Sequence, residues 1–271
     1  VFFIVQLPFS VCAVWLLFVL FKGHKTHSDH LLAWIMALLS VSLICGSYHM
    51  APYPRYDRMV IYNIIMQLAS LAVFPTICIY IRSLYEESKE NPVTYLLFLP
   101  SVLQTTSGVV ITSLLGISHS ADVLSGLIGG GLIRDRLDVL ERAYMLMSHD
   151  VYYSLFFISL SLSLIYVFSK LFTGKFKFIH IISFLRGQKS SFVANILCLF
   201  FVIYFVFWGI CLISPNVFMH TASIWSSLWS VSAAFVLFLI GYVSAIPSLP
   251  GGYINMERLR HPFNAMRQSR Q

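Results

Sequence analysis

Apolar runs of about 20 residues, separated by short polar stretches, recur along the whole chain of 271 residues. A bilayer core about 30 Å thick is crossed by a helix of about 20 apolar residues, so each run is long enough to span a membrane. Only 11% of the residues are charged and 58% are hydrophobic, whereas a soluble domain has about 25% charged residues. The sequence therefore predicts an integral membrane protein.

The runs are continuous rather than alternating, which favours helices over the strands of a membrane barrel. Every backbone N–H and C=O must be paired inside lipid, so a spanning segment is either a helix or part of a closed barrel. Barrel strands would read as alternating segments of about 10 residues. We therefore predict an all-α polytopic bundle of seven transmembrane helices. The predicted spans are 1–21, 31–50, 59–81, 93–117, 144–172, 192–213 and 221–245.

Two prolines and one long connection interrupt this pattern. Pro75 predicts a kink in the third span, and Pro75 and Pro100 are candidate flexible points. The longest connection, residues 118–142, is predicted to carry a short amphipathic helix at the membrane surface in its second half. That expectation rests on the helical spacing of Leu132, Ile133, Leu137 and Leu140.

The distribution of Lys and Arg predicts the orientation. Seven spans place 5 of the 18 basic residues on one side, namely Arg55, Arg58, Arg134, Arg136 and Arg142. The other side then holds 13, from Lys22 and Lys25 in the first loop to Arg258, Arg260, Arg267 and Arg270 in the tail. Cytoplasmic loops carry the Lys/Arg excess, so we expect the N-terminus outside and the C-terminus inside. Residues 1–246 would form the membrane domain and residues 247–271 a basic cytoplasmic linker.

Amide side chains within the apolar runs are the first candidates for a ligand site. Such amides either join helices through hydrogen bonds or line a ligand cavity, and both interpretations stay open. Asn63 and Gln67 are four residues apart and therefore share a helix face. Together with Gln104 they form the candidate ligand-binding set. Gln6 and Asn195 are further amides in predicted spans.

His149 and Asp150 begin the apolar part of the fifth predicted span. An ionisable pair at membrane depth is a functional candidate, here for sensing a ligand or a proton. The alternative is placement near the outer membrane surface with access to water. No other Asp, Glu, Lys or Arg lies deep in a predicted span, which argues against a proton-coupled transporter or an ion pump.

Signals for metal binding and catalysis are weak. His24, His27, Asp29 and His30 could face one ion if their segment were helical, but a solvated basic loop is the simpler interpretation. The sequence has no HExxH, GxSxG or phosphate-binding P-loop motif. We therefore predict no enzymatic activity, no cofactor and no metal.

Four short segments of this sequence form a recognisable set. The first two are Val73-Phe-Pro-Thr-Ile-Cys-Ile-Tyr-Ile-Arg-Ser-Leu84 and Tyr95-Leu-Leu-Phe-Leu-Pro100. The others are Ser28-Asp-His-Leu-Leu32 and Phe235-Val-Leu-Phe-Leu-Ile-Gly-Tyr242. The most distinctive single residues in them are Pro75, Tyr80, Arg82, Pro100 and Gly241. Together these segments resemble the seven-helix membrane regions of Bacteroidetes-type transcriptional regulators.

The resemblance implies a sensory or anchoring domain in a bacterial inner membrane. Its C-terminus would continue into a cytoplasmic AraC-type helix-turn-helix domain, and residues 247–271 would begin the linker. The implied partners are the lipid bilayer, a small ligand of unknown identity, DNA through that further domain, and a second copy of the chain in a homodimer. The alternatives are a small-molecule transporter, a membrane-bound acyltransferase, and the membrane domain of a sensor histidine kinase.

Overall fold

The computed structural model describes residues 6–23, 27–48, 55–85, 92–128, 137–172, 202–203, 206, 227–228 and 230–242. This part of the chain is helical and has no strand, as predicted. Three helical segments, His27–Gly46, Tyr56–Ser83 and Tyr95–Leu115, are long and apolar enough to cross a membrane. They indicate a membrane protein. The seven-span bundle and its orientation stay predictions, because most of the sixth predicted span and the tail 247–271 lie outside the described residues.

The first two helices form an antiparallel hairpin. α2 spans Leu7–Phe21 and α3 spans His27–Tyr48. Pro8 lies in the first turn of α2, where a missing backbone N–H removes no helical hydrogen bond. Beyond the end of α2, the Lys22 ammonium lies 2.9 Å from both carboxylate oxygens of Asp29 in the first turn of α3. This ion pair joins the two helices at the turn.

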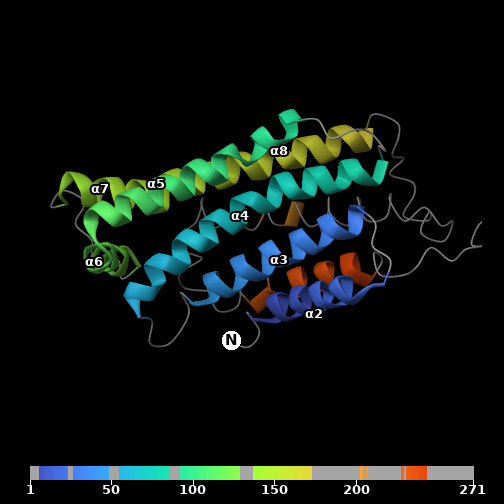
Figure 1. Cartoon of the computed structure of the whole chain (residues 1–271), viewed down its shortest axis with the longest axis horizontal. Coiled ribbons are helices and arrows are strands. Elements are labelled where there is room, and N and C mark those ends of the chain that lie inside the picture. Colours follow the sequence, from blue (N-terminus) through green and yellow to red (C-terminus); the bar gives the residue numbers. More distant parts are fainter. Residues whose placement is uncertain are drawn as a thin grey trace, which may run out of the picture.

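α4, Tyr56–Tyr85, is the central element of the molecule. Its 30 residues correspond to about 45 Å at 1.5 Å per residue. Figure 1 shows α4 running along the molecule with α3 on one side and α5 and α8 on the other, and α4 packs against all three. Pro75 lies inside α4, and the helix continues past it to Tyr85. The Thr76 hydroxyl donates to the carbonyl of Ala72 at 2.7 Å, next to the position where proline supplies no N–H.

The fourth predicted span consists of two elements. A 3₁₀ helix, η1, covers Pro92–Phe98, and α5 follows over Leu99–Leu115. Pro100 therefore lies in the first turn of α5 rather than in a helix interior, so it does not break the helical hydrogen bonds of α5. Gly116 ends α5 with φ of 85°, a left-handed conformation that glycine adopts without steric strain.

The first part of the predicted connection 118–142 is helical, which the sequence did not indicate. Residues Ile117–Ile128 form a helix, α6, at one end of the bundle (Figure 1). Ala121, Val123 and Leu124 are buried, whereas Ser118, His119 and Asp122 are exposed, so α6 is itself amphipathic. The amphipathic helix was predicted around Leu132–Leu140; residues 129–136 lie outside the described part of the chain.

The fifth predicted span begins earlier than expected and contains a π-helical turn. α7 (Val139–Met145), the π-helix η3 (Leu146–Val151) and α8 (Tyr152–Phe172) follow one another without a break. At the start of α7, the Asp138 N–H donates to the Glu141 carboxylate at 2.9 Å in a capping box. That cap explains why the helix begins at Val139 although the apolar run starts at Tyr144.

Two apolar clusters hold these helices together. The larger cluster joins α2, α3, α4, α8 and the helix Ser230–Tyr242, and it includes Phe74 and Phe156 with ring centroids 5.0 Å apart. The smaller cluster joins α4, α6 and α7 and includes Tyr144 and Met145. The helix Ser230–Tyr242 packs against α2 at Gly241, where a Cβ atom would overlap the Trp15 indole. Gly241 therefore permits a close helix approach.

α5 has the opposite polarity from a helix of a soluble protein. Its buried residues are Ser101, Gln104, Gly108 and Thr112. Its exposed large side chains are Leu99, Val102, Leu103, Val109, Val110 and Leu114. In water this arrangement would expose apolar surface and bury polar groups, whereas in a bilayer the apolar face contacts lipid and the small or polar face contacts other helices. This pattern supports the membrane assignment independently of helix length.

Candidate functional site

The π-helical turn Leu146–Val151 is the local irregularity around which the buried polar residues gather. In a π turn each N–H bonds to the carbonyl five residues earlier, so the junctions with α-helix leave backbone groups outside the regular ladder. At its end, the Tyr152 N–H donates to the carbonyl of His149. π turns are rare and occur frequently at functional sites. The segment contains no glycine or proline that would predict it.

Two glutamine side chains from neighbouring helices donate to backbone carbonyls of this turn. The Gln104 amide of α5 donates to the Met147 carbonyl at 2.6 Å and to Oε1 of Gln67 at 3.1 Å. The Gln67 amide of α4 donates to the Ser148 carbonyl at 2.9 Å. Both glutamines are 2% exposed. The two amides therefore connect α4, α5 and η3 through three hydrogen bonds.

The orientation of both amides follows from their partners. A backbone carbonyl only accepts hydrogen bonds, so each Nε2, rather than Oε1, must face the π turn. Gln104 Nε2 uses its two N–H groups on Met147 and Gln67. Gln104 Oε1 is then buried with no hydrogen-bond partner among the residues the structure describes.

The polar network extends from the π turn into α8. The Ser70 hydroxyl lies 3.0 Å from the Tyr152 hydroxyl and donates to the Gln67 carbonyl at 3.2 Å. Because Ser70 has a single proton to donate, the Tyr152 hydroxyl is the donor in the bond between them. All the side chains of this network are uncharged. We call Gln67, Ser70, Gln104 and Tyr152, with the carbonyls of Met147 and Ser148, the amide network.

Asn63 lies one turn before Gln67 on the buried face of α4. Of the three amides in the predicted ligand-binding set, Gln67 and Gln104 are in direct contact. Within the described ranges, no hydrogen bond joins Asn63 to the amide network. The structure thus brings two of the three amides together, and ligand binding by them stays a prediction.

His149 and Asp150 lie inside the π turn. His149 Nδ1 is 2.7 Å from Asp150 Oδ1, and the two side chains are 43% and 37% exposed. The His149 ring meets the Tyr153 ring edge to face at a centroid distance of 4.9 Å. Because the helix begins at Val139, the pair lies about 15 Å along it at 1.5 Å per residue. The sequence placed the pair close to a helix end, and the structure places it deeper.

Four buried hydroxyls have no hydrogen-bond partner among the described residues. They belong to Ser40 of α3, Thr112 of α5, Ser120 of α6 and Tyr144 of α7. Thr112 follows Gln104 by eight residues on the same buried face of α5, and Tyr144 belongs to the smaller apolar cluster, which Ala121 of α6 also joins. An unpaired buried hydroxyl costs about 1–3 kcal/mol, so such groups commonly hold internal water or a polar ligand.

The remaining predicted residues have structural contacts. Tyr80 is buried and lines a small cavity with Met36, Ile77 and Leu237, whose walls are otherwise aliphatic. Arg82 is in the last turn of α4.

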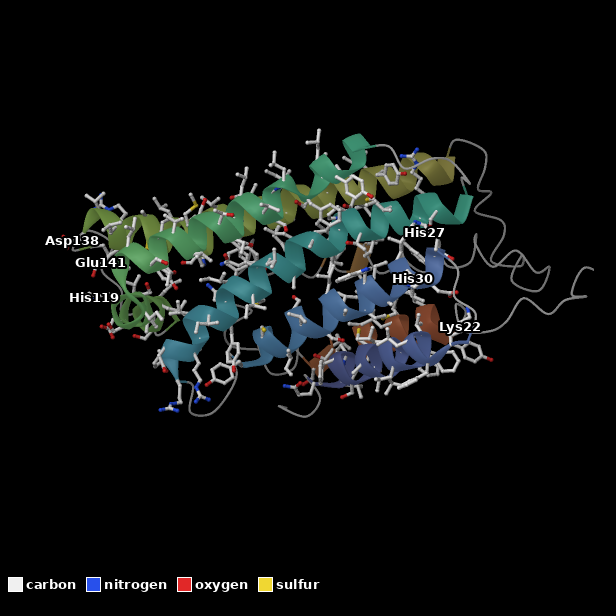
Figure 2. The ribbon with its side chains drawn as sticks, viewed as in Figure 1. Lys22, His27, His30, His119, Asp138 and Glu141 are labelled. Atoms are coloured by element: carbon white, nitrogen blue, oxygen red, sulfur yellow. The ribbon has the colours of Figure 1, made fainter. Side chains whose placement is uncertain are left out.

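Of the metal-like cluster, Asp29 is paired with Lys22, and His24 lies outside the described residues. In the described ranges, no three metal-binding side chains gather at one point. Figure 2 shows Lys22, His27 and His30 at one end of the bundle and His119, Asp138 and Glu141 at the other.

Sequence reasoning missed the π turn and its carbonyls. The acceptors that Gln67 and Gln104 bind are backbone atoms, which carry no sequence signal of their own. The glutamines themselves were detectable, because amides within apolar runs need partners.

Comparison with protein-family models, and searches among curated proteins and among solved structures, found no match to this chain. The resemblance to membrane-bound transcriptional regulators therefore stays a prediction.

Proposed function

We propose that this chain is the membrane sensory domain of a signal-transducing regulator in a bacterial inner membrane. A small ligand or a change in the membrane would favour one helix packing over another, and the last helix would pass that change to a cytoplasmic effector domain. The observation that carries the proposal is the amide network on the π turn. It joins three helical elements through buried, uncharged hydrogen bonds at a backbone irregularity.

An uncharged network suits a sensor better than an ion pump. Hydrogen bonds between helices in membranes contribute about 0.6–2 kcal/mol each, so a ligand of modest affinity can compete with them. A ligand shifts a two-state equilibrium only by its differential affinity for the two states. Buried charge, which ion-coupled transport usually needs, is absent from the side chains of the amide network.

The proposed output is DNA binding by an AraC-type helix-turn-helix domain on the cytoplasmic side. This part of the proposal rests on the sequence resemblance and on the Lys/Arg excess that predicts an inside C-terminus. A homodimer would suit an effector that binds paired DNA half-sites. The ligand in this proposal is small and uncharged, because the groups that Gln104 contacts by hydrogen bonds, the Gln67 amide and the Met147 carbonyl, carry no charge.

The test uses the full-length gene product and a transcriptional reporter for the promoters nearest to its gene. We expect Gln104→Leu to change reporter output at least several-fold at unchanged protein level in the membrane. The matched control is Leu103→Ala, which alters the exposed face of the same helix and should leave the output unchanged. Equal output from wild type and Gln104→Leu would contradict the proposal. Autophosphorylation of the gene product with ATP would indicate a histidine kinase in place of a DNA-binding output. Uptake of a substrate without a reporter effect would favour a transporter, and acyl transfer without a reporter effect would favour an acyltransferase.

A further inference from the structure

The π turn lies between the two apolar clusters of the molecule. Tyr152, Phe156 and Leu160 of α8 belong to the larger cluster, and Tyr144 and Met145 of α7 belong to the smaller one. The six residues Leu146–Val151 are the covalent connection between these two packed ends of one continuous helix. A change in the length of the turn would therefore move one cluster relative to the other.

A π turn is equivalent to an α-helix with one additional residue inserted. Its carbonyls at Met147 and Ser148 would accept backbone N–H groups four residues later in a regular α-helix. Here the Gln104 and Gln67 amides occupy those two acceptors at 2.6 and 2.9 Å. Both donors are buried, so their withdrawal would leave the carbonyls of Met147 and Ser148 without these partners. The backbone N–H groups four residues later in an α-helix could then donate to the two carbonyls instead.

The smaller cluster does not favour one register strongly. The Tyr144 hydroxyl is buried there with no partner among the described residues, which disfavours the present register. If α7 were displaced by one residue away from α8, Met145 would take the place of Tyr144, and Tyr144 would take the place of Ala143, which is only partly buried. α8 is better fixed, because Phe156 packs on Phe74 and Tyr152 is hydrogen-bonded to Ser70. The part that can move is therefore α7, together with the α6 end of the bundle.

The geometry points to a register switch in the helix Val139–Phe172, in which Gln67 and Gln104 hold the turn Leu146–Val151 in its π form. When the two amides release the carbonyls of Met147 and Ser148, the turn closes to an α-helix. α7 then moves by one residue position, which is about 100° of rotation and 1.5 Å of translation. This inference concerns the mechanics of the helix and holds whether or not the chain is a sensor.

The first experiment measures distances by pulsed electron paramagnetic resonance on the full chain in lipid nanodiscs. Spin labels carried by unnatural amino acids leave the five cysteines unchanged. One label pair reports on α7, at the exposed positions Val139 and Leu114. The control pair, Leu162 of α8 and Leu103 of α5, is also exposed and lies outside the moving part.

The tested variant is the double substitution Gln67→Leu/Gln104→Leu. We expect the distance between Val139 and Leu114 to shift by about 5–10 Å, as a rotation of about 100° at the radius of a helical side chain requires. The distance between Leu162 and Leu103 should stay within 2 Å, roughly the reach of label rotamers. Unchanged distances in both pairs would overturn the inference.

A second variant tests the register switch even if the double substitution disturbs the whole fold. Deleting Ser148 removes one residue from the π turn, so the segment should become α-helical while α7 keeps its present face. We expect this shortened chain to keep the wild-type distance between Val139 and Leu114. Gln67→Leu/Gln104→Leu should then lower its melting temperature by less than half as much as in the full-length chain.

The control deletion removes Leu162 from the regular part of α8. It should rotate all following side chains by about 100° and abolish folding, because no π turn there holds an extra residue. Equal sensitivity of the shortened and full-length chains to the loss of both amides would overturn the inference. If the reporter output does not respond to Gln104→Leu but the distance between Val139 and Leu114 shifts as expected, the sensor function is rejected and the register switch is retained.

Discussion

Single side chains in this protein differ in whether their polar atoms have partners, and that difference determines what a substitution does. Gln104 makes two hydrogen bonds, one to a side chain and one to a backbone carbonyl. Thr112, two turns further along the same buried face, has an unpartnered hydroxyl within the described residues. Removing a polar group therefore leaves other groups unsatisfied at position 104 and leaves none at position 112.

Gln104→Leu should destabilise the protein by about 1–3 kcal/mol, because the Met147 carbonyl and Gln67 Oε1 lose their donor in a buried site. Thr112→Val is the matched control and should leave stability unchanged or raise it. Thermal unfolding of the purified protein in one detergent, followed by circular dichroism, measures both. A larger loss for Thr112→Val than for Gln104→Leu would show that the Thr112 hydroxyl has a partner, such as bound water.

Gly241→Ala should be more destabilising than a glycine substitution normally is. The new methyl group would overlap the Trp15 indole, and overpacking of this kind costs about 1–3 kcal/mol. Gly23→Ala is the control, since no atom lies within 4 Å of its Cβ position. The smaller ring of Trp15→Phe should restore part of the stability of Gly241→Ala in the same unfolding assay. Equal melting temperatures for Gly241→Ala and Gly23→Ala would contradict the close packing.

At the scale of helices, run length and cap chemistry set how much could be predicted. The apolar runs correctly indicated α2, α3, α4, α5 and α8, because apolar stretches of that length are seldom anything but spans. α6 was missed because Ser118, His119 and Asp122 made the residues after Ile117 read as part of a non-apolar connection, although the buried Ala121 and Leu124 follow a helical period. The π turn was unpredictable, since its cause is tertiary: donors from α4 and α5.

The ion pair between α2 and α3 makes a second prediction at this scale. The Asp29 side chain is 8% exposed and that of Lys22 is 30% exposed, so removing Lys22 leaves a nearly buried carboxylate without this partner. Lys22→Met should destabilise the hairpin by about 1.5–3 kcal/mol, as expected for a lost charge-assisted hydrogen bond. Lys22→Met/Asp29→Asn should recover most of that loss. An additive loss in the double variant, measured by thermal unfolding, would contradict the coupling of the two residues.

For the molecule as a whole, the two ends of the bundle differ in chemistry, and the predicted spans would place them on opposite sides of a membrane. Lys22, His27 and His30 mark one end in Figure 2, and His119, Asp138 and Glu141 mark the other. The first end coincides with the side on which the sequence places most of the Lys and Arg residues. Together with the outward apolar face of α5, this arrangement favours a bundle that crosses the bilayer lengthwise.

Cysteine labelling tests the predicted orientation of the whole bundle. A cysteine at Arg58 should react with a membrane-impermeant maleimide in intact spheroplasts, whereas a cysteine at Lys22 should react only after permeabilisation. Cys12, Cys45 and Cys78 are buried and should stay unlabelled in the folded protein. Reaction of Lys22→Cys in intact spheroplasts would reverse the orientation.

The Lys22 and Asp29 pair also bears on how such a bundle is made. Its two residues are seven positions apart, so the contact needs no later part of the chain. The first hairpin can consequently assemble while the ribosome is still synthesising α4, the helix that contacts most of the others. When α4 emerges, it enters the membrane beside a preassembled apolar surface from α3. Its Gln67 and Ser70 gain their partners in the amide network only when α5, the π turn and Tyr152 of α8 have followed.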